Sequence, residues 1–147
     1  MRKYVSTVAS IGASLGLVYT LSSTSAQAAE VTLYKNPQCR CCEGYAEYLR
    51  ENGHTVTVKP THQLVPMSRD AGIPSSLQGC HLAIVDDYVV SGHVPVGTID
   101  RLLSERPDIK GITLPGMPAG SPGMTGRKTR PFKIYEVGEE TKIYAVE

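Results

Sequence analysis

Three cysteines crowd into four positions of the stretch NPQCRCCEG: Cys39, Cys41 and Cys42. A fourth, Cys80, lies much later in LQGCHLAIV, and the chain has no others. Cys39 and Cys42 form a C-x-x-C pair, the dithiol spacing of redox enzymes. Cys39 and Cys41 form C-x-C, a spacing that suits a metal–thiolate loop. These thiols could therefore form disulfides, carry out redox chemistry or bind a metal.

The first residues indicate the compartment. Arg2 and Lys3 precede an apolar run from about Val8 to Leu21, and Ala26-Gln27-Ala28 fits an A-x-A cleavage site. We therefore predict a signal peptide over residues 1–28, a single domain over 29–147, and a periplasmic or secreted protein. The alternative is an uncleaved membrane anchor, but the run is short and rich in Ser, Gly and Ala.

Charge and aromatic content limit the classes of partner. Fifteen basic and 14 acidic residues give a net charge of +1, and the charges are spread along the chain. The chain also has one Phe and no Trp. These features predict no nucleic-acid partner and no membrane span after signal cleavage.

Hydrophobic patterning predicts an α/β domain. We expect strands at 31–35, 54–59, 81–85, 88–91, 132–137 and 141–146, and helices at 43–52, 63–71 and 96–105. Asp86-Asp87 suggests a tight turn, and Gly53 suits a helix C-terminus. This order matches a thioredoxin-like fold, a mixed sheet flanked by helices, with a C-terminal β-hairpin. The Pro/Gly-rich stretch LPGMPAGSPGMTG is predicted to be a loop.

The predicted fold places the cysteines together. Cys41 and Cys42 should lie at or just before the first turn of the first helix, where unpaired N–H groups stabilise a thiolate. In thioredoxin-like folds the loop entering the third strand passes beside this motif, so Cys80 should face the triplet. Redox thioredoxins usually have a cis-proline there, whereas this chain has Cys80-His81. The difference favours metal binding over redox catalysis.

Three interpretations of the cysteines remain open. Ordinary secreted-protein disulfides explain Cys80 pairing with Cys39 or Cys42, but not three crowded thiols. One zinc ion fits the cramped triplet poorly. Crowded thiolates can instead bridge several soft ions, and thiolate and thioether ligands select Cu(I). Secondary candidates for metal binding or proton transfer are His81, His93, Met117 and Met124. Strand alternation would point His81 away from Cys80.

Four stretches together resemble the CopG-type periplasmic copper-resistance proteins: LYKNPQCRCCEGYAEYLRENG, CHLAIVDDYVVSGHVP, RLLSERPDIKGITLPGMPAGSPGM and PFKIYEV. The resemblance covers roughly Val31 to Val146. It implies a thioredoxin-like fold that holds a polynuclear copper cluster on Cys39, Cys41, Cys42 and Cys80. It also implies a role in copper or silver tolerance, with interconversion of Cu(I) and Cu(II).

The functional expectation is therefore a copper-binding protein that holds several Cu(I) ions per chain. Its partners would be metal ions and other periplasmic copper-handling proteins, and no catalytic residue is assigned. The chief alternative is a periplasmic thiol–disulfide oxidoreductase that uses Cys39 and Cys42. A disulfide-stabilised binding domain is the third.

Overall fold

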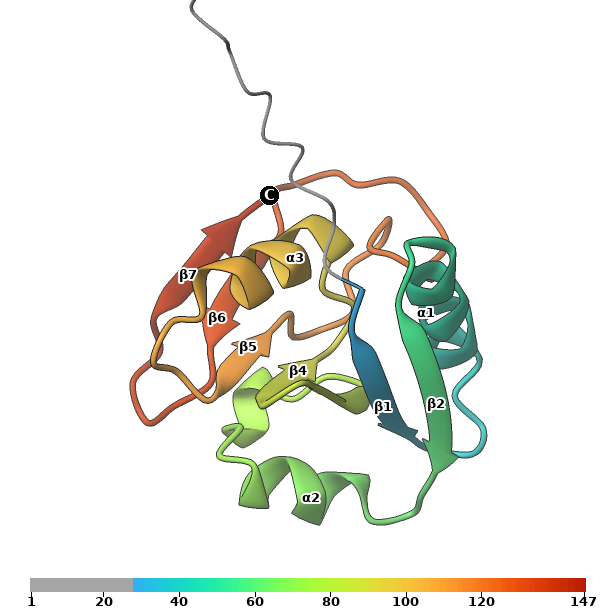
Figure 1. Cartoon of the computed structure of the whole chain (residues 1–147). Coiled ribbons are helices and arrows are strands. Elements are labelled where there is room, and N and C mark those ends of the chain that lie inside the picture. The colour runs from blue at the N-terminus through green and yellow to red at the C-terminus, as the bar shows by residue number, and fades with distance from the viewer. Residues whose placement is uncertain (1–27) are drawn as a thin grey trace, which may run out of the picture.

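The computed structural model describes residues 28–147, so the predicted signal peptide, apart from its last residue, lies outside the described residues. The described residues form a single α/β domain (Figure 1). In chain order its elements are β1 (Glu30–Lys35), α1 (Arg40–Glu51), β2 (Thr55–Pro60), α2 (Leu64–Asp70), the 3-10 helix η1 (Ser75–Leu77), β3 (His81–Val85), β4 (Tyr88–Ser91), α3 (Val96–Glu105), β5 (Gly111–Thr113), β6 (Lys133–Glu136) and β7 (Ile143–Val146).

All seven strands belong to one mixed sheet in the order β2-β1-β3-β4-β5-β6-β7. β1 runs parallel to β2 and antiparallel to β3, and β3 forms a hairpin with β4 through the Asp86-Asp87 turn. β5 runs parallel to β4, and β6 and β7 form the antiparallel C-terminal hairpin. The predicted α/β class, mixed sheet and terminal hairpin are therefore confirmed. The thioredoxin-like assignment remains a prediction with which the β2-β1-β3-β4 order agrees.

The helices divide between the two faces of the sheet. α1 and α3 pack on one face, where Tyr45, Leu49, Ile99 and Leu102 join inward-facing residues of β1, β3, β4, β5 and β6. On the other face α2 and η1 contribute to a smaller cluster around Ile73, Leu77 and Leu82. The cysteine motif lies with the larger core, because Cys42 is completely buried in it.

Three elements differ clearly from the sequence prediction, and one of them, η1, was not predicted. α1 begins at Arg40 rather than at residue 43, so Cys41 and Cys42 lie within its first turn. The short strand β5 was not predicted, because three residues are too few to show alternation. Its first residue, Gly111, has φ 157°, and an added Cβ would lie 1.9 Å from the Val89 carbonyl oxygen. The close pairing of β5 with β4 therefore requires glycine there.

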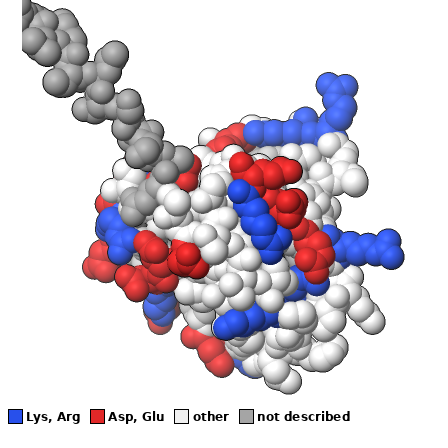
Figure 2. Space-filling view, turned by 45° about the vertical axis from the view of Figure 1, so that its right-hand side comes forward, with Lys and Arg blue, Asp and Glu red and all other residues white. Residues whose placement is uncertain are grey.

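The surface mixes charges of both signs. Basic and acidic side chains are interspersed over the face in Figure 2, as the small net charge suggests. Within residues 28–147, no helix combines the length and the apolar character that crossing a membrane requires.

Candidate metal centre

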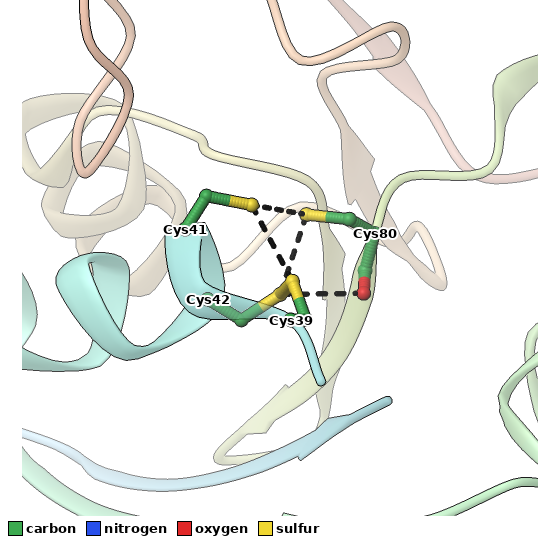
Figure 3. A group of neighbouring side chains, drawn as sticks. All are labelled: Cys39, Cys41, Cys42 and Cys80. Carbon is green, nitrogen blue, oxygen red and sulfur yellow. Dashed lines mark hydrogen bonds between the residues drawn. A yellow bond between two sulfur atoms is a disulfide. The ribbon is translucent and has the colours of Figure 1, made fainter. Parts of the chain in front are cut away.

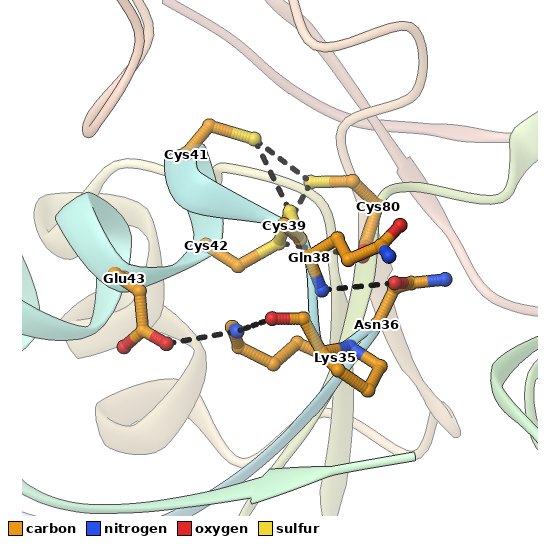
Figure 4. A network of polar contacts seen from close by, with 9 residues as sticks. Lys35, Asn36, Gln38, Cys39, Cys41, Cys42, Glu43 and Cys80 are labelled. Carbon is orange, nitrogen blue, oxygen red and sulfur yellow. Dashed lines mark hydrogen bonds and ion pairs between the residues drawn. A yellow bond between two sulfur atoms is a disulfide. The ribbon is translucent and has the colours of Figure 1, made fainter. Parts of the chain in front are cut away.

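A tight turn presents the first cysteine to the helix. Asn36 Oδ1 accepts a hydrogen bond from the Gln38 N–H at 3.0 Å, and the Asn36 carbonyl accepts one from the Cys39 N–H at 3.0 Å (Figure 4). These bonds reverse the chain after β1, so that Cys39 becomes the N-cap of α1. The Asn-Pro pair therefore ends the strand and places the thiols at the helix N-terminus.

A buried lysine fixes this turn. The Lys35 side chain is 2% exposed, and its ammonium group lies 2.8 Å from the Glu43 carboxylate in the first turn of α1. The same group donates to the Pro37 carbonyl at 3.3 Å (Figure 4). Lys35 thus connects the end of β1, the turn and the helix. Lys35 was not among the predicted site residues, since a lysine that ends a strand gives no sign of burial in the sequence.

The four sulfur atoms lie together (Figure 3). Cys39 and Cys42 are joined by a disulfide, with an S–S distance of 2.12 Å, whereas Cys41 and Cys80 are free thiols. Cys41 Sγ lies 3.4 Å from Cys39 Sγ and 3.8 Å from Cys80 Sγ. Cys80 Sγ lies 3.5 Å from Cys42 Sγ. The prediction that Cys80 faces the triplet is therefore confirmed.

Two glycines allow Cys80 to come this close. The segment before β3 packs against the end of β4, where the Gly79 N–H donates to Ser91 Oγ at 3.0 Å. A Cβ on Gly79 would lie 2.4 Å from the Gly92 nitrogen. A backbone contact this close leaves no room for a side chain at position 79. The Gly79–Gly92 contact therefore holds Cys80 and the segment bearing His93 at a fixed spacing.

His93, two residues after the end of β4, lies beside the sulfurs. Its Nδ1 donates to the Pro122 carbonyl oxygen, and its Nε2 lies 3.0 Å from Cys80 Sγ. A carbonyl can only accept, so Nδ1 carries the proton and Nε2 of the neutral ring presents its lone pair to Cys80. Burial lowers the pKa of His93 and keeps the ring neutral.

His81 also lies beside Cys80, contrary to the prediction from strand alternation. Its Nδ1 is 3.7 Å from Cys80 Sγ. Cys80 precedes the first residue of β3, so the pleat of the strand does not set its direction. The His81 ring is completely buried, and its Nε2 has no hydrogen-bond partner among the described residues. Burial and then nearby His93 lower the pKa of His81 to about 3.

The Tyr45 ring packs against both imidazole rings. Its ring centroid lies 4.6 Å from that of His81 and 5.0 Å from that of His93. Its hydroxyl donates to the Val94 carbonyl at 2.8 Å. Tyr45 was not among the predicted site residues. Its position four residues after Cys41 and three after Cys42 could have indicated it, because those spacings share a helix face.

The thiol of Cys80 resists ionisation. Burial, together with the neighbouring Cys41, raises the pKa of Cys80 to about 12. The metal-free protein therefore holds Cys80 as a thiol that donates to His93 Nε2. A bound cation would have to displace this proton, so metal binding would weaken as the pH falls.

The loop bearing Met117 and Met124 reaches the site through its backbone. The Pro122 carbonyl oxygen accepts the hydrogen bond from His93. The Gly123 backbone packs on Gly44 of α1, where an added Gly44 Cβ would lie 3.2 Å from the Gly123 carbonyl oxygen. Met117 is 37% exposed, and Met124 is partly buried. Both methionines remain predicted ligands.

The side chains form two overlapping sets of four donors. One set is Cys39, Cys41, Cys42 and Cys80, and the other is Cys42, Cys80, His81 and His93. Within each set the donor atoms all lie within 4.8 Å of one another. Soft sulfur donors beside neutral imidazoles suit copper, and the second set also suits zinc. The unpartnered Nε2 of His81 further fits a metal site, because a buried polar atom costs free energy until something binds it.

Comparisons with known proteins identify structures that this chain resembles. Residues 77–124 match a family described as a protein of unknown function, DUF411, and this segment includes Cys80, His81 and His93. Two solved structures of a copper resistance protein copG, forms 2 and 1, are each 29% identical to this chain. They have TM-scores of 0.75 and 0.74 and cover 82% of this chain and 99% and 98% of their own. No curated protein matches. The resemblance to CopG-type proteins is therefore confirmed.

Proposed function

We propose that this protein binds copper as Cu(I) in a cysteine-bridged cluster of several ions and acts in copper or silver tolerance. The observation that carries the proposal is the gathering of four sulfurs and two imidazoles into overlapping sets with donor atoms no more than 4.8 Å apart. The copper resistance proteins that share the fold support the same conclusion. The predicted signal peptide adds that the protein works in the periplasm or outside the cell.

Binding requires the site to be reduced and deprotonated. Two electrons and two protons convert the Cys39–Cys42 disulfide into two thiols, and an external reductant must supply them. Each thiol then loses its proton as it binds copper. Four thiolates this close can each bridge two ions, which allows more copper than a single tetrahedral site would hold. His93 and His81 would add nitrogen donors at one side.

Copper stoichiometry tests the proposal. Reduced protein handled without oxygen should bind more than one Cu(I) per chain, and elemental analysis with thiol counting measures this number. Cys80→Ser should lower it, because Cys80 belongs to both donor sets. Zinc added in competition should be displaced by Cu(I). Binding of at most one Cu(I), unchanged in Cys80→Ser, would contradict the proposal.

Interconversion of Cu(I) and Cu(II) is the finer part of the proposal. Thiolates favour Cu(I), and imidazoles also suit Cu(II), so the mixed donors can accommodate both states. An electron partner outside the chain is required. Electron paramagnetic resonance of copper-loaded protein under stepwise oxidation tests this, since Cu(II) is paramagnetic and Cu(I) is silent. Loss of copper on oxidation, without a bound Cu(II) signal, would limit the protein to holding Cu(I).

A thiol–disulfide oxidoreductase is the second candidate, and the Cys39–Cys42 disulfide at the helix N-terminus favours it. Such an enzyme should reduce protein disulfides and retain much of this activity in Cys80→Ser. The third interpretation, a disulfide-stabilised binding domain, predicts no free thiols. Thiol counting on denatured, metal-stripped protein isolated without oxidation tests it, and the free Cys41 and Cys80 argue against it.

A further inference from the structure

A cavity of about 540 Å³ lies between the Pro/Gly loop and β6. One wall is formed by Leu114–Gly116, Pro118 and Ala119, and the other by Thr129–Lys133 and Tyr135. Pro115, Pro118 and Pro131 provide flat apolar surface. The volume falls within the range of about 300–1,000 Å³ that is common for ligand sites. None of the predicted copper ligands lines this cavity.

The cavity lies in the most basic stretch of the domain. Four of the seven residues from Arg127 to Lys133 are basic, and none is acidic, so the expectation of evenly spread charge is wrong here. Arg130 and Lys133 line the cavity, and both are exposed. Neither they nor Arg127 and Lys128 make an ion pair within the described residues. The cavity therefore combines an apolar wall with uncompensated positive charge.

The same loop connects the cavity to the metal centre. Leu114, at one end of the loop, packs so closely on Gly92 that a Gly92 Cβ would lie 2.1 Å from the Leu114 carbonyl oxygen. Pro122, farther along, accepts the hydrogen bond from His93. The segment that forms the cavity wall thus lies between two contacts to the strand end that bears His93. An occupant of the cavity would sit beside the loop that orients this imidazole.

We propose that the cavity binds an acidic, extended peptide segment of a partner protein. Carboxylates would pair with Arg130 and Lys133, and apolar side chains would lie on the prolines and Tyr135. Nucleic acid fits less well, because base stacking needs an exposed aromatic ring. Of the two aromatic residues that line the cavity, Phe132 is only 5% exposed, with the Lys128 ammonium 4.5 Å from its ring centroid, and Tyr135 is only partly exposed. The proposal does not depend on which metal the cysteines bind.

Fluorescence polarisation with a defined probe tests the proposal on the 29–147 chain and on the full chain. The probe is a labelled peptide of glutamate, proline and leucine, and its control has lysine in place of every glutamate. Only the acidic peptide should bind, and added salt should weaken it because the attraction is electrostatic. Arg130→Gln with Lys133→Gln should weaken binding by about tenfold or more. The matched pair Arg69→Gln with Lys142→Gln removes two exposed charges elsewhere and should leave binding unchanged.

Several results would overturn the proposal that the cavity binds an acidic peptide. Equal binding of both peptides would show that the charge of the peptide does not determine binding, and equal weakening by both double variants would show a non-specific charge effect. Either result would overturn the proposal. Displacement of the acidic peptide by free glutamate at equal concentration would assign the cavity to small anions instead. Tighter binding of an oligonucleotide that Arg130→Gln with Lys133→Gln abolishes would assign it to nucleic acid. Repeating the titration with Cys80→Ser should give the same affinity, so that failure of copper binding is distinguished from failure of the peptide site.

Discussion

At the scale of single residues, Cys41 separates the two main functional candidates. It takes no part in the Cys39–Cys42 disulfide, yet its sulfur lies within 3.8 Å of Cys80 and 3.4 Å of Cys39. Cys41→Ser should therefore lower the number of bound Cu(I) ions while leaving a C-x-x-C dithiol intact. Anaerobic copper titration and a disulfide-reduction assay on the same variant measure the two effects. Full copper binding with lost reductase activity would reverse our assignment.

His81 should make the metal-free protein sensitive to acid. Its pKa of about 3 in the folded chain lies below its usual 6.5, because burial disfavours the charged ring. Between these values the unfolded chain takes up a proton that the folded chain does not. His81 therefore lowers the free energy of unfolding by about 1.4 kcal/mol for each pH unit that the pH falls through this window.

His81→Phe tests this dependence, because phenylalanine can keep the stacking on Tyr45. In denaturant unfolding, the free energy of unfolding of the variant should fall less steeply than that of the wild type as the pH is lowered from 6.5 to 3. The exposed His62 provides the control, since His62→Phe should leave the slope of the wild type. An identical slope in His81→Phe would show that other groups cause the acid sensitivity.

At the scale of elements, the contact between α1 and the Pro/Gly loop should govern the site. Gly123 has φ 74°, and an added Cβ would lie 2.5 Å from the Tyr45 nitrogen. Gly123→Ala should force the loop away from α1, move Pro122 off His93, and cost about 1–3 kcal/mol of unfolding free energy. It should also weaken copper binding, which a purely local strain would not do.

Gly116 offers a matched control for that experiment. It lies in the same loop with φ 76°, but nothing lies within 4 Å of an added Cβ. Gly116→Ala should therefore lower the free energy of unfolding by about 1 kcal/mol, through backbone strain alone, and should leave copper binding unchanged. Equal effects of the two substitutions on stability and on copper would mean that the loop–helix contact does not support the site.

The sequence predicted most of the elements but only part of the site. β3, β4 and α3 match their predicted ranges, because their apolar patterns end at clear turn residues. Cys80 could be assigned to the cysteine site because the predicted strand order implied its position. Tyr45 and Lys35 were missed, since their burial depends on contacts between elements. The carbonyl of Pro122 could not be predicted, because only the folded backbone determines where a carbonyl points.

At the scale of the whole molecule, copper should act as a stabilising ligand. The proposed donors come from α1, from the segment before β3 and from the end of β4, so a bound cluster would connect them. Free Cu(I) at about 1,000 times its dissociation constant should raise the free energy of unfolding by about 4 kcal/mol. Thermal unfolding of reduced protein, with and without copper, measures this effect. A copper chelator should reverse it, and Cys80→Ser should reduce it.

The hydrogen bond between Pro122 and His93 also bears on when the protein can acquire its metal. It joins residues 29 positions apart, and the sulfur cluster joins Cys41 to Cys80 across 39. While the chain is being synthesised or translocated, these groups are not yet held close together. The unfolded chain therefore offers scattered thiols rather than a selective metal site. Selectivity for copper would arise only after the sheet has formed and the late Pro/Gly loop has closed. The compartment in which folding finishes would therefore determine which metal the protein encounters first.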